Sequence, residues 1–261
     1  MSDIKSIKRV VVKIGTSSLF AGDAPNTKMI NHLAEDISEL QSRGKEIILV
    51  SSGAIGFGRE KLFLTDSKLS LEMQQATAAI GQNLLIHAYE KAFSSRHKII
   101  AQLLLTHQNF ANKNALQSLK NTAEKLIELN TVPIINENDP ISAEELDVDG
   151  YFSDNDELAA LCAIHFKAEL LIILTNVSGI FTENPDSSAD AKIINDVAQL
   201  EKFRNFTEEK SALGSGGVKS KVIAAKKALA NDVQVIVCKA GKNVIKNIFR
   251  GKIPGSYFKP E

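Results

Sequence analysis

The chain has 261 residues and carries 31 basic side chains (Lys and Arg) against 31 acidic ones (Asp and Glu), so its formal net charge is zero. Balanced charge gives no reason to expect a main role in binding nucleic acid or a membrane surface. With 44% hydrophobic residues, the chain is long enough for one large α/β domain or two small ones without stabilising disulfides.

Short apolar runs rich in Val and Ile predict buried strands, as in a parallel sheet that is covered on both faces. In chain order the expected elements are the strand Val10–Ile14, the helix Thr27–Ser42, the strand Ile47–Val50, the helix Leu71–Arg96, the strand Ile99–Leu105, the helix Asn114–Leu129, the strand Val132–Ile135, the helix Asn155–His165, the strand Leu170–Leu174, the helix Lys219–Ala230 and the strand Val233–Val237. Strands that alternate with helices of this length predict an α/β fold with a mainly parallel sheet.

The two cysteines, Cys162 and Cys238, lie in apolar runs without a His cluster, so we expect buried hydrophobic side chains and no zinc site. The apolar run Val10–Ile14 is too short for a signal peptide. No segment approaches the length of a membrane span. We therefore expect a cytoplasmic protein.

Ligands of open α/β sheets bind beyond the carboxyl ends of the strands. Small, polar and glycine residues follow four of the expected strands: Gly15-Thr16-Ser17, Ser51-Ser52-Gly53-Ala54, Asn136-Glu137-Asn138-Asp139 and Thr175-Asn176. The sequence therefore predicts a binding site at this edge of the sheet.

Lys13 interrupts an apolar strand, and a buried ammonium group is costly unless it meets an anion. A side chain that reaches solvent from an edge strand is the alternative. The segment Leu213–Lys221 places a glycine run before a helix, with lysines in the first turn, where they oppose the helix dipole. Such a loop can hold a phosphate, although a flexible loop with solvated lysines is also compatible. Neither segment has the spacing of a P-loop or of a dinucleotide-binding motif.

Two further segments, Asn136–Pro140 and Ser153–Glu157, carry carboxylates and amides after a strand and at the start of a helix. These groups could bind an ammonium group or Mg²⁺, or hold the lysines in place. For Asp154, capping of the helix is the alternative role.

Taken together, these segments resemble the amino acid kinase family, and within it the branch that phosphorylates glutamate. The segments that carry the resemblance are Lys13–Ser17, Ser51–Ile55, Ile135–Asp139, Ser153–Asp156 and Gly214–Gly217 with Lys221. The resemblance runs from Lys8 to the C-terminus. The sequence departs from that branch at Asn176, where the branch usually has Asp, and at Ser153, where it usually has Gly.

The resemblance implies one amino acid kinase domain over residues 1–261, a three-layer α/β/α sandwich around a mainly parallel sheet. An acceptor-substrate half would span roughly residues 1–165 and a nucleotide-binding half residues 166–261. Because the chain stops at Glu261, it resembles the members that lack an added C-terminal RNA-binding-like domain.

The resemblance also implies roles for individual residues. Lys13 and Lys221 would hold the transferring phosphoryl group, and Asp156 would organise the two lysines. The acceptor would be bound by Ser52, Gly53, Asp139, Asp154 and Asn155. ATP would be bound by Lys13, Gly15, Thr175, Asn176, Ser215, Gly216, Gly217, Val218, Lys219, Ser220 and Lys221. The protein itself would supply no metal ligand, because Mg²⁺ would arrive with ATP.

The implied reaction is phosphorylation of the γ-carboxylate of L-glutamate by ATP, the first step of proline synthesis. Further implications are proline as a feedback inhibitor, a glutamyl phosphate reductase as pathway partner, and a homodimer or homotetramer that binds neither nucleic acid nor membrane. Alternatives are a kinase acting on N-acetylglutamate, aspartate or a nucleoside monophosphate, and a non-catalytic sensor of glutamate or proline on the same fold.

The residues themselves weigh on these alternatives. Glu137 and Asp139 favour an acceptor with a free ammonium group over an acetylated amine. No Arg or Lys stands near Asn136 to bind a phosphate on the acceptor. The presence of Lys13, Asp156 and Lys221 disfavours a mere sensor.

Overall fold

The computed structural model describes residues 4–64, 68–141, 155–183, 185, 188, 190–202 and 217–260. Within these ranges, seven strands form the main sheet in the order β5-β6-β4-β1-β7-β8-β9. Neighbouring strands are parallel, except that β9 is antiparallel to β8. The strands are β1 (Arg9–Ile14), β4 (Glu46–Ser51), β5 (Ile100–Leu105), β6 (Val132–Glu137), β7 (Leu170–Thr175), β8 (Gln234–Lys239) and β9 (Ser256–Phe258), with a separate hairpin of β2 (Phe20–Ala21) and β3 (Ala24–Pro25).

The helices connect these strands and cover the sheet. They are α1 (Thr16–Leu19), α2 (Thr27–Ser42), α3 (Ala54–Lys61), α4 (Leu71–Ser94), α5 (His107–Ala111), α6 (Lys113–Glu128), α7 (Asn155–His165), α8 (Val197–Lys202), α9 (Val218–Leu229) and α10 (Val244–Phe249). Asn26 and Ser70 cap the N-termini of α2 and α4. Each side-chain oxygen accepts a hydrogen bond from the backbone N–H three residues further on. Every strand and helix in the expected chain order is present, with ends shifted by at most two residues.

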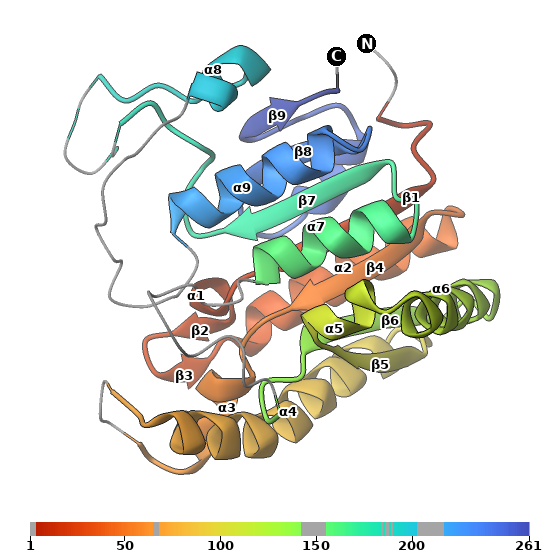
Figure 1. Cartoon of the computed structure of the whole chain (residues 1–261), viewed down its shortest axis with the longest axis vertical. Helices are drawn as coiled ribbons and strands as arrows, with labels where there is room; N and C mark the ends of the chain where they lie inside the picture. The colour runs from red at the N-terminus through yellow and green to blue at the C-terminus, as the bar shows by residue number, and fades with distance from the viewer. Residues whose placement is uncertain are drawn as a thin grey trace.

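Two separate hydrophobic clusters lie on the two faces of the sheet. Because successive strand residues face opposite sides, Val10 and Val12 pack in a cluster with residues of α2, α4 and α10, whereas Val11 packs in a cluster with residues of α6, α7 and α9. Figure 1 shows α7 and α9 in front of the sheet and α2 behind it. The expected three-layer α/β/α sandwich is therefore confirmed. Lys13, two residues after Val11, projects from the face that α7 and α9 cover.

Helices α3 and α4 approach each other closely through glycine. A Cβ atom on Gly81 of α4 would lie 1.8 Å from the backbone oxygen of Ala54, and one on Gly58 of α3 would lie 2.0 Å from the backbone oxygen of Thr77. No side chain fits at either position, so the two backbones can meet only because both residues are glycine. This contact holds the middle of α4 against the first turn of α3, next to the carboxyl end of β4.

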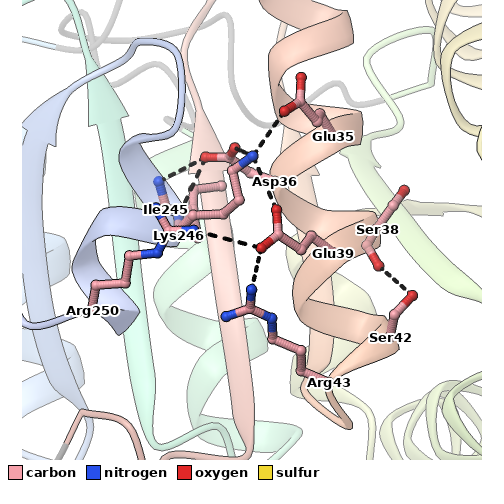
Figure 2. A network of polar contacts seen from close by, with 9 residues as sticks. All are labelled: Glu35, Asp36, Ser38, Glu39, Ser42, Arg43, Ile245, Lys246 and Arg250. Carbon is pink, nitrogen blue, oxygen red and sulfur yellow. Dashed lines mark hydrogen bonds and ion pairs between the residues drawn. The ribbon is translucent and has the colours of Figure 1, made fainter.

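A network of charged side chains fixes α10 to α2 (Figure 2). The buried Lys246 Nζ lies 2.8 Å from Glu35 Oε1, 3.1 Å from Glu39 Oε2 and 3.4 Å from Asp36 Oδ1. Asp36 Oδ2 also accepts a hydrogen bond of 2.9 Å from the backbone N–H of Ile245, at the start of α10. The carboxylate thereby satisfies a backbone donor that a helix start leaves unpaired. The network anchors the last helix of the chain to the layer behind the sheet.

Both cysteines are free thiols in the interior. Burial raises the pKa of Cys162 and Cys238, so the interpretation of these residues as small hydrophobic side chains is confirmed. Across the described ranges, no helix is long and apolar enough to cross a membrane.

Candidate active site

Two lysines and one aspartate from three different elements meet in the interior of the protein. Lys13 comes from β1, Asp156 from the first turn of α7 and Lys221 from the first turn of α9. Lys13 Nζ lies 2.6 Å from Asp156 Oδ1, and Lys221 Nζ lies 3.0 Å from Asp156 Oδ2. All three side chains are buried, with exposed fractions of 3%, 0% and 6%. The structure thus brings together the three residues that the sequence suggested for phosphoryl transfer.

The carboxylate of this cluster is ionised. Burial raises the pKa of Asp156, but the ammonium groups of Lys13 and Lys221 outweigh that effect and hold the pKa well below its usual range. Asp156 is therefore charged at neutral pH, and it holds two ammonium groups close together in the interior. Two fixed cations at one point can stabilise a bound anion.

Ser220 adds a neutral hydrogen bond to the same carboxylate. Its Oγ lies 3.0 Å from Asp156 Oδ2 and 2.9 Å from the backbone oxygen of Gly217. The sequence suggested Ser220 only as part of the ATP-binding loop. In the structure, its hydroxyl contacts the carboxylate that joins the two lysines.

Gly15 and Thr175 lie at the carboxyl ends of the neighbouring strands β1 and β7, beside this cluster. Ile14 of β1 pairs with Leu174 of β7, so the residues that follow them lie at the same edge of the sheet. A Cβ atom on Gly15 would stand 3.5 Å from Lys13 Nζ, so glycine leaves the space next to that ammonium group open. Thr175 is buried, and its hydroxyl donates a 3.2 Å hydrogen bond to Asn176 Oδ1. An anionic nucleotide fits such an edge, with small residues next to fixed positive charge.

Residues at the carboxyl ends of β4 and β6 lie on the other side of β1. Asn155, the first residue of α7, donates hydrogen bonds of 2.8 Å to Ser52 Oγ and 3.1 Å to Asn136 Oδ1. Gly53 has a φ of 113°, which favours glycine. It connects Ser52 to the first residue of α3, Ala54. Ser52, Gly53 and Asn155 were all expected to bind the acceptor, and they lie together.

Asp139 follows β6 by two residues and carries a perturbed carboxyl group. Burial alone raises the pKa of Asp139 to about 6. A carboxylate that has lost part of its hydration gains from a cation placed beside it. The environment of Asp139 is therefore compatible with the binding of an ammonium group.

Some of the suggested residues lie outside the described ranges or at their border. Asp154, Ser215 and Gly216 are outside them, as is Ser153. Gly217 precedes α9, and Val218 and Lys219 in its first turn are exposed. In the described part of the chain, no group of three or more His, Cys, Asp or Glu side chains is placed to hold a metal ion.

Gln82 is a residue of this region that the sequence motifs do not predict. Gln82 lies in the middle of α4, and its Oε1 accepts a 2.7 Å hydrogen bond from Asn136 Nδ2. Nothing in the local sequence distinguishes this glutamine from other polar residues of the helix. Asn136 belongs to the predicted segment Asn136–Pro140, but the family resemblance implied no role for it.

The chain is similar to known proteins along most of its length. The sequence matches the amino acid kinase family over residues 8–239. A glutamate 5-kinase of Enterococcus faecalis is 38% identical over 260 residues, which cover 98% of this chain and 96% of that protein. A glutamate 5-kinase of Citrifermentans bemidjiense is 36% identical over 261 residues, which cover 98% of this chain and 69% of that protein.

Solved structures share the fold at low sequence identity. Carbamate kinase from Giardia lamblia bound to AMP-PNP has a TM-score of 0.67 at 17% identity, covering 98% of this chain and 100% of that one. UMP kinase from Ureaplasma parvum has a TM-score of 0.62 at 16% identity, covering 97% and 99%. With the family matched over most of its length, and with relatives that align along nearly all of it, the chain belongs to the amino acid kinase family.

Proposed function

We propose that the chain transfers the γ-phosphoryl group of ATP to the γ-carboxylate of L-glutamate and forms L-glutamyl 5-phosphate, the first step of proline synthesis. The observation that carries the proposal is the buried cluster of Lys13, Asp156 and Lys221, in which one carboxylate holds two ammonium groups close together. The glutamate 5-kinases that match nearly the whole chain support glutamate as the acceptor.

The reaction joins two anions, so its main requirements are charge neutralisation and alignment. A carboxylate is already ionised near neutral pH and needs no general base. The bond between the γ-phosphorus and the bridging oxygen of ATP breaks, a bond to the glutamate oxygen forms, and ADP leaves. Lys13 and Lys221 would neutralise the charge that spreads over the transferred group, with Asp156 holding both ammonium groups in place.

The nucleotide would lie at the edge formed by β1, β7 and the start of α9. Gly15, Thr175 and Asn176 would contact ATP from the strand ends, and the segment from Ser215 to Lys221 would contact its phosphates. Mg²⁺ bound to those phosphates would supply further positive charge. The acceptor half of residues 1–165 and the nucleotide half of residues 166–261 would then meet at the lysine cluster.

The acceptor would lie against Ser52, Gly53, Asp154 and Asn155, with its ammonium group near Asp139. We further propose that proline inhibits at this site, that a reductase consumes the labile acyl phosphate, and that the chain forms a homodimer or homotetramer. These proposals rest on the family resemblance.

A coupled assay of ADP release tests the proposed function. Release should depend on glutamate. N-acetylglutamate should support it weakly, because it lacks the free ammonium group that the proposal places near Asp139, and aspartate should support it weakly, because its shorter side chain moves the reacting carboxylate away from the lysines. Binding of glutamate without release of ADP would indicate a sensor. A preference for N-acetylglutamate or aspartate would indicate a different member of the family.

The acceptor site should weaken in mild acid. Because the pKa of Asp139 is raised to about 6, its carboxylate takes up a proton as the pH falls through that value and loses its attraction for the ammonium group. The ammonium group of glutamate keeps its charge in this range. We expect KM for glutamate, measured at saturating ATP, to rise between about pH 7 and pH 5.

The matched variant is Asp139→Asn, which removes the titration and the charge together. At neutral pH it should raise KM for glutamate about 10- to 100-fold, as expected for the loss of a charge-assisted hydrogen bond, and KM for ATP much less. Its KM for glutamate should not depend on pH across the same range. An equal rise in both KM values would show that Asp139 is not an ammonium ligand.

A further inference from the structure

Three amide side chains and one hydroxyl form a continuous chain of hydrogen bonds beside the proposed acceptor site. Gln82 of α4 accepts a 2.7 Å hydrogen bond from Asn136 Nδ2 in β6. Asn136 Oδ1 accepts a 3.1 Å hydrogen bond from Asn155 Nδ2 in α7, and the same Nδ2 donates 2.8 Å to Ser52 Oγ after β4. Four elements that are distant in sequence thus hold one another at this point.

One buried oxygen atom in this series of hydrogen bonds has no partner among the described residues. Asn155 Oδ1 is buried and forms no hydrogen bond with the described residues. Both hydrogens of Asn155 Nδ2 are used, one for Asn136 and one for Ser52, so the opposite side of the amide presents an acceptor. A buried acceptor without a donor is costly, and a bound ligand could satisfy it.

Free glutamate has one suitable donor. Both of its carboxylates are ionised near neutral pH and only accept hydrogen bonds, so its ammonium group alone can donate. The orientation of Asn155 seen in the structure therefore matches an amino acid with a free amine. A rotated amide would present Nδ2 instead, which repels an ammonium group.

We infer that Gln82 positions the acceptor-binding residues. It acts through Asn136 and keeps Asn155 Oδ1 available to the ammonium group of the acceptor. This inference rests on the proposed function. With Gln82 Oε1 facing Asn136, exchanging the donors and acceptors of Asn136 and Asn155 would set two amide oxygens against each other, so the orientation of Gln82 decides the direction. Gln82 forms one end, and as long as its Oε1 accepts from Asn136, the amides of Asn136 and Asn155 keep the orientation that suits the amine.

The fold holds Gln82 firmly in this place. Its side chain is only 8% exposed and that of Asn136 only 2%. The preceding residue, Gly81, is in close contact with the backbone of Ala54 at the start of α3, so α4 has little freedom to move relative to the acceptor site. A short, buried and rigid connection is what a positioning residue requires.

The experiment compares Gln82→Met with Gln82→Glu. Met has a similar size but cannot accept a hydrogen bond from Asn136, whereas an ionised Glu only accepts and so maintains the direction of the chain. We expect Gln82→Met to raise KM for glutamate about tenfold, with KM for ATP changed less than about twofold, and Gln82→Glu to stay within about threefold of wild type. Asn83→Met is the control, because Asn83 is the next residue of α4 and is exposed; it should leave both KM values unchanged.

A second background shows whether Gln82 acts through Asn155. In Asn155→Ala, which has a high KM for glutamate of its own, adding Gln82→Met should raise KM no further, because the group that Gln82 positions is absent. If Gln82→Met still raises KM for glutamate tenfold in the Asn155→Ala variant, Gln82 does not act through Asn155. That result would overturn the inference.

Two other results would also overturn it. One is a wild-type KM for glutamate in Gln82→Met, and the other is an equal rise of both KM values, which would indicate general loosening of the fold. A wild-type chain that releases no ADP with glutamate contradicts the proposed function and this inference with it. An active wild type with an unaffected Gln82→Met variant contradicts the inference alone.

Discussion

Replacing Lys221 or Lys13 with Met should each lower kcat about 100- to 1,000-fold, the loss typical of removing one group that stabilises charge in the transition state. Both ammonium groups lie within 3.0 Å of Asp156 in the interior, where a positive charge acts strongly on a nearby anion. Met keeps the length of the side chain and fills the buried space. The measurement is the rate of ADP release at saturating ATP and glutamate.

The same pair of helices provides a matched control. Lys227, about 1.7 turns after Lys221 on α9, forms an ion pair with Glu157 of α7, but both side chains are 37% exposed. Lys227→Met should leave kcat near the wild-type value, because it removes a similar pair between the same helices away from the buried cluster. Wild-type kcat in both Lys13→Met and Lys221→Met would refute the assigned roles.

Asp156→Asn should destabilise the fold by about 3–5 kcal/mol, the usual cost of removing one partner from a buried ion pair. The change leaves the ammonium groups of Lys13 and Lys221 buried next to a neutral amide in place of the carboxylate. The free energy of unfolding, obtained from urea titration at neutral pH, measures this loss. Asp156→Asn should also abolish most of the activity, because the ammonium groups lose the carboxylate that sets their positions.

The pH dependence of this loss follows from the sign of the pKa shift. The folded-state pKa of Asp156 lies below its unfolded value, so the carboxylate contributes stability above the unfolded pKa and loses it as the pH falls toward the folded pKa. The difference between wild type and Asp156→Asn should therefore be constant around neutral pH. It should shrink only below about pH 4, where the unfolded chain takes up the proton.

Two variants separate the buried charge from the rest of α7. Glu157→Gln, at the next residue, removes a half-exposed ion pair and should cost no more than about 1 kcal/mol. Adding Lys221→Met to Asp156→Asn should restore part of the lost stability, because one of the two repelling charges is gone. An unfolding free energy of Asp156→Asn equal to that of wild type would show that the carboxylate does not hold the lysines.

The alternation of apolar and helical segments determined the fold class and the position of the site at the strand ends. Val10–Ile14 and Leu170–Leu174 are apolar enough to identify buried strands, and a parallel sheet brings their carboxyl ends to one edge. The sequence did not predict the shortest elements, each of six residues or fewer: α1, α5, α8, α10, β2, β3 and β9. A helix of one or two turns is too short to show a periodic pattern, and its ends depend on contacts such as that of Asp36 with Ile245.

The sequence by itself identified Lys13 as a charge that needs a partner, and the motifs around it indicated the family. The family resemblance suggested Asp156 as that partner, and only the tertiary structure showed the contact. Asp156 has the position of a residue that could simply begin a helix, and Lys221 stands 65 positions further along the chain. They meet because β1 lies in the middle of the sheet and α7 and α9 cover the same face of it (Figure 1). The role of Gln82 also follows only from the tertiary structure. Its hydrogen bond joins α4 to β6, and the local sequence does not predict how these elements pack against each other.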